Sequence, residues 1–478
     1  MKKQAFNPFL PSWEYIPDGE PHLFGGRVWL YGSHDRFGGN TWCENDYVTW
    51  SAPEDDLSDW RFEGTIYNKA QDPENSKGTR YMYAPDVAEK NGKFYLYYTL
   101  DNMIGTVSVA CADSPAGPFR FYGKVRYPNG RVAGSEKGDL YNFDPAVFVD
   151  DNGKVYLYSG FCTRPVEQKT YDERGMRYGL YCYPLEEDML TIAGKPSLLI
   201  PLGEELEKSS FRGHGFHEGS SMRKFGGWYY LIWSSQNRNE LCYAMSDRPD
   251  YGFEYKGVLI SNGDVGIHGI TEQTCRNYMG NNHGSLIEIG KKRYIFYHRQ
   301  TNKHSFSRQA CAEQIEVLPD GSMRQAEMTS CGLNSGCLSG EGDYPAYIAC
   351  NLYRGKGAAY YDDGVDLRGL PYFTQSGEDR EGNGDQYIAD MYDGAVAGFK
   401  YFDLSETKQI SVFLRGKADG RFEVYGEGNR LIAEIDISIV DGEMRFFAPL
   451  HGGGTRSPLY FCYRGEGSID FISFSLHK

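Results

Sequence analysis

The chain has 478 residues and a formal net charge of −15 at pH 7. This excess of acidic residues argues against nucleic acid and anionic membrane surfaces as partners, whereas it is compatible with a neutral substrate. Hydrophobic residues make up 40% of the chain and charged residues 24%, which excludes a disordered protein and leaves room for two or three domains.

The cysteines and the first residues indicate a compartment. The eleven cysteines are odd in number and include no Cys-x-x-Cys pair, which is typical of reduced thiols in a cytosolic protein. After Met-Lys-Lys come Gln4, Asn7, Pro8 and Pro11 instead of the apolar run of a signal peptide. No apolar stretch is long enough to span a membrane. We therefore expect a cytoplasmic protein.

A short segment rich in aromatic residues recurs five times along the first two thirds of the chain. Its copies are Gly26–Tyr31, Gly92–Tyr97, Gly153–Tyr158, Gly227–Ile232 and, more loosely, Lys292–Tyr297. Successive copies begin 66, 61, 74 and 65 residues apart. A β-rich unit repeated at this length is typical of a propeller with one blade per copy, so residues 1–325 are predicted to form a five-bladed β-propeller.

Each copy is predicted to be the second strand of a hairpin. In the third copy, Asp144–Val149 forms the first strand and Asp150–Gly153 the turn. Asn91-Gly92 and Gly226-Gly227 supply the turn in the second and fourth copies. The first strand of each hairpin would be the innermost of its blade, so its first residue would face the mouth of the central channel.

One polar residue stands six to nine positions before every copy. These residues are Asp18, Asp86, Asp144, Glu218 and His283. The same place in five blades predicts that they meet at one end of the channel. Hydrolysis of a glycosidic bond uses two carboxyl groups that flank the bond, one protonated and one ionised, and a third carboxylate can raise the pKa of the acid. The alternative is that these residues cap strand ends or bind a channel water.

The composition changes after the last repeat. Residues 326–343 are rich in serine and glycine and are predicted to connect the propeller to a second domain, residues 344–478. That domain alternates as a β-sandwich does, with expected strands at Gln409–Leu414, Phe422–Tyr425, Leu431–Ile437, Met444–Ala448 and Ile469–Ser475. The whole chain is therefore expected to be all-β.

The five polar positions and their neighbours resemble glycoside hydrolase family 43. The segments that carry the resemblance are Pro17–His22, Tyr31–Asp35, Tyr83–Val87, Asp144–Phe148, His217–Gly219 and Asn282–Ser285. They occur in the order of the family and cover about residues 10–325. The resemblance implies a five-bladed propeller and an inverting enzyme of the β-xylosidase or α-L-arabinofuranosidase type.

The resemblance also implies roles for single residues. Asp18 resembles the general base, Glu218 the general acid, and Asp144 the carboxylate that orients the acid and raises its pKa. His283 resembles a channel histidine that holds a cation, often through water, and Arg308 an arginine that contacts the sugar. Asp86 resembles the aspartate of a substrate-binding motif.

Some positions leave alternatives open. Glu20, two residues after Asp18, is a rival for the base because both would lie on one strand face. Tyr83 stands where many members have tryptophan, which puts stacking at that subsite in doubt. His214 and His217 have a spacing that suits a metal, but the neighbouring glycines disfavour a helix, so we expect loop histidines beside the acid. His34 and Asp35 are expected either to contact substrate hydroxyls or to form a surface turn.

The C-terminal segment from Pro371 through Phe402 resembles family 6 carbohydrate-binding modules, and we expect it to support the propeller or the rim of the site rather than to bind sugar independently. The sequence thus predicts an enzyme that releases xylose or arabinofuranose from the non-reducing ends of neutral oligosaccharides. A hydrolase of another furanoside, such as a β-galactofuranoside, and a non-catalytic sugar-binding propeller remain alternatives. We expect no required cofactor. The sequence is compatible with a Ca²⁺ ion in the channel and with a homo-oligomer.

Overall fold

The computed structural model describes residues 5–101, 105–163, 170–361, 366–380 and 385–478. Strands dominate this part of the chain, and its one α-helix is the short α1 (Gly203–Glu207). Among the same residues, no helix combines the length and the apolar character needed to cross a bilayer. All eleven cysteines are described, and all are free thiols.

The first two thirds of the chain form five antiparallel sheets, each with its strands in sequence order. The first sheet holds β1 (Glu20–Phe24), β2 (Arg27–Tyr31), β3 (Tyr47–Pro53) and β4 (Arg61–Tyr67). The second holds β5 (Met82–Lys90), β6 (Lys93–Leu100), β7 (Ser108–Ala112) and β8 (Arg120–Lys124). The third holds β9 (Ala146–Val149), β10 (Val155–Phe161), β11 (Gly179–Leu185) and β12 (Ser197–Leu198). The fourth holds β13 (Phe216–Phe225), β14 (Trp228–Ser235), β15 (Glu240–Ser246) and β16 (Glu254–Ser261), and the fifth β17 (Leu286–Ile289), β18 (Lys292–Thr301) and β19 (His304–Ile315).

The first strands of the five sheets close a ring. Strand β1 contacts β5, β5 contacts β9, β9 contacts β13, β13 contacts β17, and β17 contacts β1 again. A parallel bridge between Gly19 and Gly284 joins the first and last sheets. The predicted five-bladed propeller, with the first strand of each hairpin innermost, is thus confirmed.

The aromatic repeat is explained by burial on both faces of the second strand of each blade. Along β2, Trp29 and Tyr31 pack against the second blade, whereas Val28 and Leu30 pack against the fifth. The same division holds for the other blades, so that five separate apolar clusters fill the five contacts between neighbouring blades. Strands buried on both faces read as continuous apolar runs instead of alternating ones.

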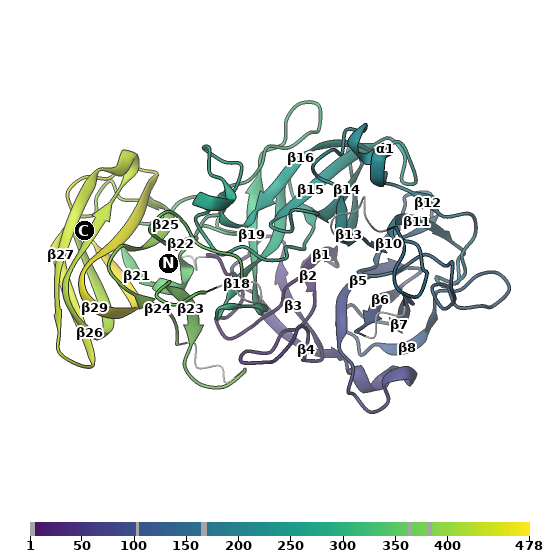
Figure 1. The fold of residues 1–478 in the computed structure, drawn as a ribbon, viewed down its shortest axis with the longest axis horizontal. Coiled ribbons are helices and arrows are strands. Elements are labelled where there is room, and N and C mark those ends of the chain that lie inside the picture. The colour runs from purple at the N-terminus through teal and green to yellow at the C-terminus, as the bar shows by residue number, and fades with distance from the viewer. Residues whose placement is uncertain (1–4, 102–104, 164–169, 362–365, 381–384) are drawn as a thin grey trace.

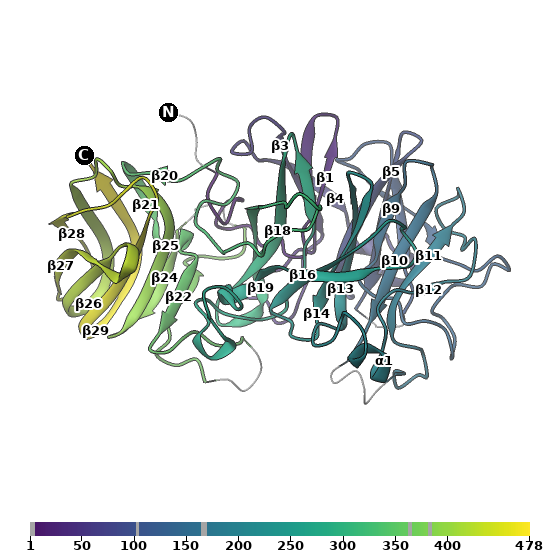
Figure 2. The same ribbon diagram turned by 90° about the horizontal axis from the view of Figure 1, so that it is seen from above.

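The C-terminal strands form one sheet that curls around its own apolar core. They are β20 (Leu338–Ser339), β21 (Gly342–Pro345), β22 (Asn351–Arg354), β23 (Tyr372–Gln375), β24 (Gln386–Met391), β25 (Ala395–Asp403), β26 (Gln409–Tyr425), β27 (Leu431–Ile439), β28 (Glu443–Pro449) and β29 (Ser457–His477). Strand β26 pairs with β29 along its whole length and with β27 and β28 on its other edge. Figures 1 and 2 show this sheet, coloured green to yellow, at one end of the molecule with the propeller at the other.

The segment between the two parts is packed rather than free. Ser330 O accepts a hydrogen bond from Asn7 N at 3.1 Å, and Ser330 N donates to Lys400 O at 2.6 Å. The side chain of Asn7 donates to Ala312 O at 3.0 Å and accepts from Ala312 N at 2.9 Å, as a neighbouring strand would. Leu333 is buried in the cluster between the first and fifth blades. The start of the chain, the last blade and the C-terminal sheet therefore meet at this segment.

Candidate active site

Two of the predicted acidic residues have a left-handed backbone conformation. Asp18, just before β1, has φ 58°, and Asp144, just before β9, has φ 43°. Such a conformation is uncommon outside glycine, although aspartate tolerates it better than most residues, and it persists where the surroundings hold it. At Asp18 the backbone N–H donates to His298 Nδ1 at 3.3 Å. Glu218 lies within β13 between two register irregularities.

These residues converge on one cavity of about 260 Å³. Its walls are formed by Asp18, Trp42, Tyr83, Ala84, Phe143, Asp144, Phe161, His217, Glu218, Arg238, Asn281, His283, Ser305 and Arg308. Three carboxyl groups, two imidazoles and two guanidinium groups from different blades thus share a pocket with four aromatic side chains. This is the convergence that the repeat predicts.

Arg308 sets the charge state of Asp18. Its Nη1 donates to Asp18 Oδ1 at 2.9 Å, while its Nε and Nη2 donate to the two oxygens of Asp35 at 2.8 and 3.0 Å. Burial alone would raise the pKa of Asp18, but the Arg308 guanidinium holds it below its usual range. Asp35 is completely buried, so its contact with Arg308 orients the guanidinium toward Asp18. Asp18 is therefore an ionised carboxylate.

His298 supports this arrangement as a neutral ring. Its Nδ1 accepts from the Asp18 N–H and its Nε2 donates to Asn281 O at 2.7 Å, which fixes one tautomer. Burial and the nearby Arg308 lower the pKa of His298 to about 3.

Asp144 has the opposite electrostatics. Its Oδ2 accepts from Gly219 N at 3.2 Å and lies 3.9 Å from His283 Nδ1. Burial raises the pKa of Asp144 well above its usual range, and the charges of Glu218 and Asp18 raise it further against the opposing effect of His283. Asp18 and Asp144 thus have pKa values shifted in opposite directions within one pocket, and perturbed carboxyl groups of this kind cluster at functional sites.

Glu218 is the most accessible of the three carboxyl groups. Its side chain is 17% exposed, against 7% for Asp18 and 6% for Asp144. His217 Nε2 lies 3.9 Å from Glu218 Oε2, while His217 Nδ1 donates to Cys162 O at 2.6 Å. The ring of Phe161 packs against His217 with centroids 5.2 Å apart. Glu218 is thus held beside a positioned histidine and faces the space that a substrate would fill.

His283 links the cavity to the channel beneath it. Its Nδ1 lies 4.0 Å from Asp18 Oδ1, and its Nε2 lies 3.8 Å from Glu20 Oε1. Although burial acts against the charged ring, the surrounding carboxylates raise the pKa of His283 to about 9. Glu20 Oε1 and His283 Nε2 are buried and have no hydrogen-bond partner among the described residues. A carboxylate oxygen and an imidazole nitrogen in this state fit a water or a cation held through water.

Glu20, the rival for the base, does not line the cavity. Its Oε2 accepts from Arg223 Nη2 at 2.5 Å and from Ser221 Oγ at 3.0 Å, which ties it to β13. Asp86 also lies outside the lining: it bonds to His22 Nε2 at 2.7 Å and accepts from Val147 N at 2.8 Å. These carboxylates join the innermost strands to one another.

His34 and Asp35 are likewise buried beside the cavity and not in its wall. His34 Nε2 lies 3.0 Å from Glu14 Oε1, and His34 Nδ1 donates to Asp46 O at 2.6 Å. His214 bonds to Glu240 Oε1 at 2.6 Å and is not part of the lining. The structure places these side chains among protein partners, and their roles in binding substrate stay predictions.

Several lining residues lie outside the repeat, and the sequence analysis does not identify them as site residues. They are Trp42, Phe143, Phe161, Arg238, Asn281 and Ser305. Trp42, in the loop between β2 and β3, is 38% exposed and donates from Nε1 to Ser305 O at 2.8 Å. The only signal in the sequence is a tryptophan directly after the turn-rich segment Gly38–Thr41, which weakly indicates a flat surface for a sugar ring. Tyr83 does line the cavity and packs edge-on against Phe143.

The C-terminal part touches the loop that carries Trp42. Asp379 accepts hydrogen bonds from Phe37 N at 2.8 Å and Asn45 Nδ2 at 3.0 Å. Next to it, Arg380 Nη1 donates to Glu14 Oε1 at 2.5 Å. Asn45 Nδ2 also donates to Asp35 O at 3.0 Å. Asn45 therefore connects Asp379 of the C-terminal part to Asp35, which binds Arg308.

Comparisons with known proteins identify the family of the chain. Residues 49–323 match the family Glycosyl hydrolases family 43. A "Xylosidase/arabinosidase" of Thermoclostridium stercorarium is 48% identical over 488 residues, covering 100% of this chain and 99% of the relative. One from Bacteroides ovatus is 28% identical and covers 61% of this chain and 87% of the relative.

Two solved structures show the same fold. A family 43 arabinoxylan arabinofuranohydrolase from Bacillus subtilis, in complex with cellotetraose, is 18% identical with a TM-score of 0.52, covering 100% of this chain and 99% of that one. A family 43 enzyme from Xanthomonas citri complexed with xylose is 24% identical with a TM-score of 0.50, covering 66% of this chain and 92% of that one. From the family match and the full-length relative, the chain belongs to glycosyl hydrolases family 43.

Proposed function

We propose that the protein is an inverting glycoside hydrolase that releases xylose or arabinofuranose from the non-reducing ends of oligosaccharides. The observation that carries this proposal is the meeting of Asp18, Asp144 and Glu218 in one aromatic-walled cavity. The cavity volume of about 260 Å³ suits one terminal sugar better than the middle of a polymer. The relatives named xylosidase/arabinosidase favour pentoses.

The chemistry follows from the different charge states. Asp18, kept ionised by Arg308, would accept a proton from the attacking water. Glu218 would protonate the leaving oxygen, because it faces the cavity most openly. Asp144, neutral to a higher pH than an ordinary aspartate, would help the site to retain a proton. We expect the carboxyl groups of Asp18 and Glu218 to lie about 6.5–9.5 Å apart, which leaves room for water in a single displacement.

None of these steps needs a cation. Glu20 and His283 would hold a Ca²⁺ ion through water, and such an ion would supply positive charge to the surrounding carboxylates. We propose that the C-terminal sheet supports the rim of the site through Asp379 and Arg380. Its likeness to family 6 carbohydrate-binding modules remains part of this proposal.

The test is Glu218→Gln, which keeps the shape of the side chain and removes the proton donor. Hydrolysis of xylobiose, which has a poor leaving group, should fall by about 10²–10⁴-fold, whereas an activated aryl β-xyloside should lose far less. Glu205→Gln is the matched control, because Glu205 lies on α1 and is 76% exposed. Equal losses on both substrates would contradict the role of Glu218 as the acid.

A second measurement identifies the sugar and the stereochemistry. Aryl β-xyloside, α-L-arabinofuranoside and β-galactofuranoside are incubated with the protein while NMR follows the anomers. Inversion predicts α-xylose as the first product of the β-xyloside. Release of sugar from the galactofuranoside alone would show that the enzyme is a galactofuranosidase. Binding without release of any sugar would indicate a non-catalytic propeller.

A further inference from the structure

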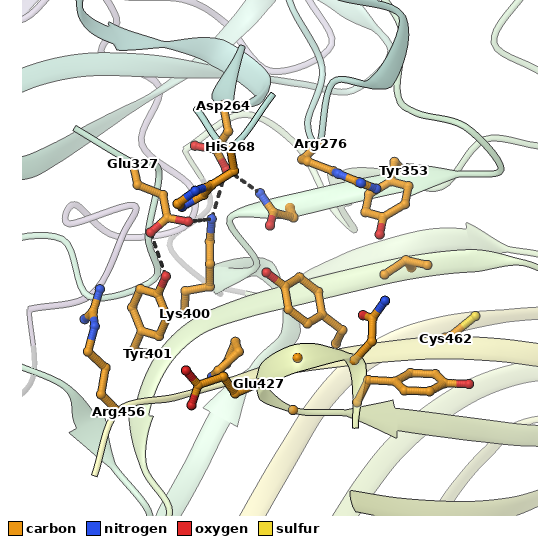
Figure 3. Close-up of a pocket in the computed structure, with 18 of the residues that line it drawn as sticks. Asp264, His268, Arg276, Glu327, Tyr353, Lys400, Tyr401, Glu427, Arg456 and Cys462 are labelled. Atoms are coloured by element: carbon orange, nitrogen blue, oxygen red, sulfur yellow. Dashed lines mark hydrogen bonds and ion pairs between the residues drawn. The ribbon is translucent and has the colours of Figure 1, made fainter. Parts of the chain in front are cut away.

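A second cavity, of about 1200 Å³, lies where the propeller meets the C-terminal sheet (Figure 3). We call it the interdomain groove, and none of the residues that line the candidate active site lines it. The propeller side contributes residues between Asp264 and Arg276 together with Glu327. The other side comes from β22, β25 and β29 and from the turns at Gly426–Asn429 and Gly454–Arg456.

A buried ion triad fixes the two sides of the groove. Lys400 on β25 is 2% exposed, and its Nζ lies 2.9 Å from Asp264 Oδ2 and 2.9 Å from Glu327 Oε1. Tyr401 donates from its hydroxyl to Glu327 Oε2 at 2.7 Å. Figure 3 shows Lys400 reaching from the C-terminal sheet to both carboxylates. The groove is therefore formed before any ligand binds, and these two carboxylates are already engaged.

Two guanidinium groups that line the groove have no acidic partner in the described part of the chain. Arg276, from the propeller, lies over the ring of Tyr353 at 4.6 Å, and Arg456, from the C-terminal part, lies over the ring of Tyr401 at 3.5 Å. No carboxylate of the described residues is within ion-pairing distance of either one. Stacking uses the flat face of a guanidinium and leaves its N–H edges to bind a carboxylate in two-pronged fashion. In a chain with a net charge of −15, such cations point to an anionic ligand.

The groove also offers surfaces for sugar rings. Tyr425 on β26 and Tyr460 on β29 are cross-strand neighbours, both half-buried, and both line the groove. Tyrosine rings provide large apolar faces with a polar tip, which suits the faces of a sugar. Gly426, Gly428 and Gly454 line the same space, so a ligand can approach the backbone closely there.

We propose that the interdomain groove is a second binding site, for a short oligosaccharide that carries a carboxylate, such as a xylo-oligosaccharide with a uronic acid side group. Tyr425 and Tyr460 take the neutral rings, and Arg276 or Arg456 takes the carboxylate. The choice of xylose as the neutral sugar rests on the proposed function. Glu427 is an exposed carboxylate of the groove, so it opposes such a ligand.

The test is calorimetric titration of the full-length Glu218→Gln variant. Its two ligands are a uronic-acid-bearing xylo-oligosaccharide and a neutral one of the same length. We expect the acidic ligand to bind about tenfold tighter or more at low salt, with a preference that falls as salt is added. Adding Arg276→Ala or Arg456→Ala should remove much of this preference, and adding Glu427→Gln should strengthen it.

The matched control is Arg368→Ala, because Arg368 is exposed, pairs with Asp366 and lies outside the groove. Equal binding of the acidic and neutral ligands would overturn the proposal, as would equal effects of the groove and control substitutions. Hydrolysis by wild type and Glu218→Gln is measured separately. If Glu218→Gln loses hydrolysis but binds both ligands equally, only the groove proposal is rejected. If it prefers the uronic-acid-bearing ligand but hydrolyses as wild type does, only the role of Glu218 as the catalytic acid is rejected.

Discussion

Gly219 imposes two constraints on the candidate active site. Its N–H donates to Asp144, and a methyl group added at this residue would lie 2.9 Å from Cγ of His283. Its φ of +67° is also one that glycine adopts freely and alanine does not. Only glycine therefore satisfies both the backbone and the imidazole here.

Gly219→Ala should shift His283 and, with it, the carboxylates around it. We expect kcat/KM to fall by roughly 10²-fold, since misplacement of catalytic groups by about 1 Å has effects of that size. Gly92→Ala is the matched control, because Gly92 has φ +74° but no atom within 4 Å of the added methyl group. Both variants should lose thermal stability to the strained backbone, and Gly219→Ala should lose more because of the clash with His283. A comparable loss of kcat/KM in both would contradict the steric argument.

The site residues that could be predicted are those tied to the repeat. Asp18, Asp144, Glu218 and His283 share one position in their blades, so one pattern predicts their meeting. Asp86 has the same position in the sequence but lies inside β5, directly after a register irregularity, and bonds to His22 and to the next blade. Spacing does not predict such an irregularity. Trp42, Arg238 and Asn281 come from loops between strands, and no periodicity predicts where such loops fold.

Among the elements, the loop between β2 and β3 connects the C-terminal part to the chemistry. It carries Asp35, which orients Arg308, and Trp42, which lines the cavity. Asp379 accepts hydrogen bonds from Phe37 N and Asn45 Nδ2 of this loop. The position of Arg308 therefore depends in part on a residue that lies 71 positions later in the chain.

Asp379→Ala should loosen this loop. We expect kcat/KM to fall about tenfold, because the loop carries Asp35 and Trp42 and small displacements of positioning groups reduce the rate. The loss of two hydrogen bonds to a charged group should also lower the melting temperature slightly. Asp366→Ala is the control, since Asp366 lies in the same domain, is 61% exposed and pairs with Arg368. Kinetics on an aryl xyloside compare the two variants, and equal kcat/KM values would show that Asp379 has no positioning role.

In the second domain, the sequence predicts where strands occur but not how long they are. Gln409–Leu414 and Phe422–Tyr425 are expected as two strands, but both belong to the single strand β26. Gly416 and Gly420 suggest a break, yet each lies against the backbone of β29, where a side chain would collide. Close backbone contact, which depends on tertiary pairing, thus continues a strand where local sequence predicts its end.

In the whole molecule, the Lys400 triad holds the propeller and the C-terminal sheet together. Lys400→Met would leave Asp264 and Glu327 without their cation, and breaking a buried pair in this way costs about 3–5 kcal/mol. Lys408→Met, at an exposed position just before β26, should be nearly neutral. Unfolding by urea measures both, and equal free energies of unfolding would refute this role of the triad.

The same triad predicts a dependence on pH. Although burial opposes it, Lys400 keeps the pKa of Glu327 below its ordinary value of 4.5. A carboxylate with a depressed pKa stabilises the folded state above its unfolded pKa, and this contribution is lost as the pH falls through the folded value. Wild type should therefore melt at a higher temperature than Glu327→Gln at pH 7, with the difference shrinking below about pH 4.5. A difference that grows on acidification would contradict this reasoning.

The hydrogen bonds around Ser330 bear on what happens when the chain is cut. Ser335 and Gly336 are exposed, so a protease could nick the backbone there. Such a nick would separate no folded units, because Ser330, Asp264 and Glu327 in the first fragment stay bound to Lys400 in the second. The two fragments should elute together as one particle, still active, and part only in denaturant.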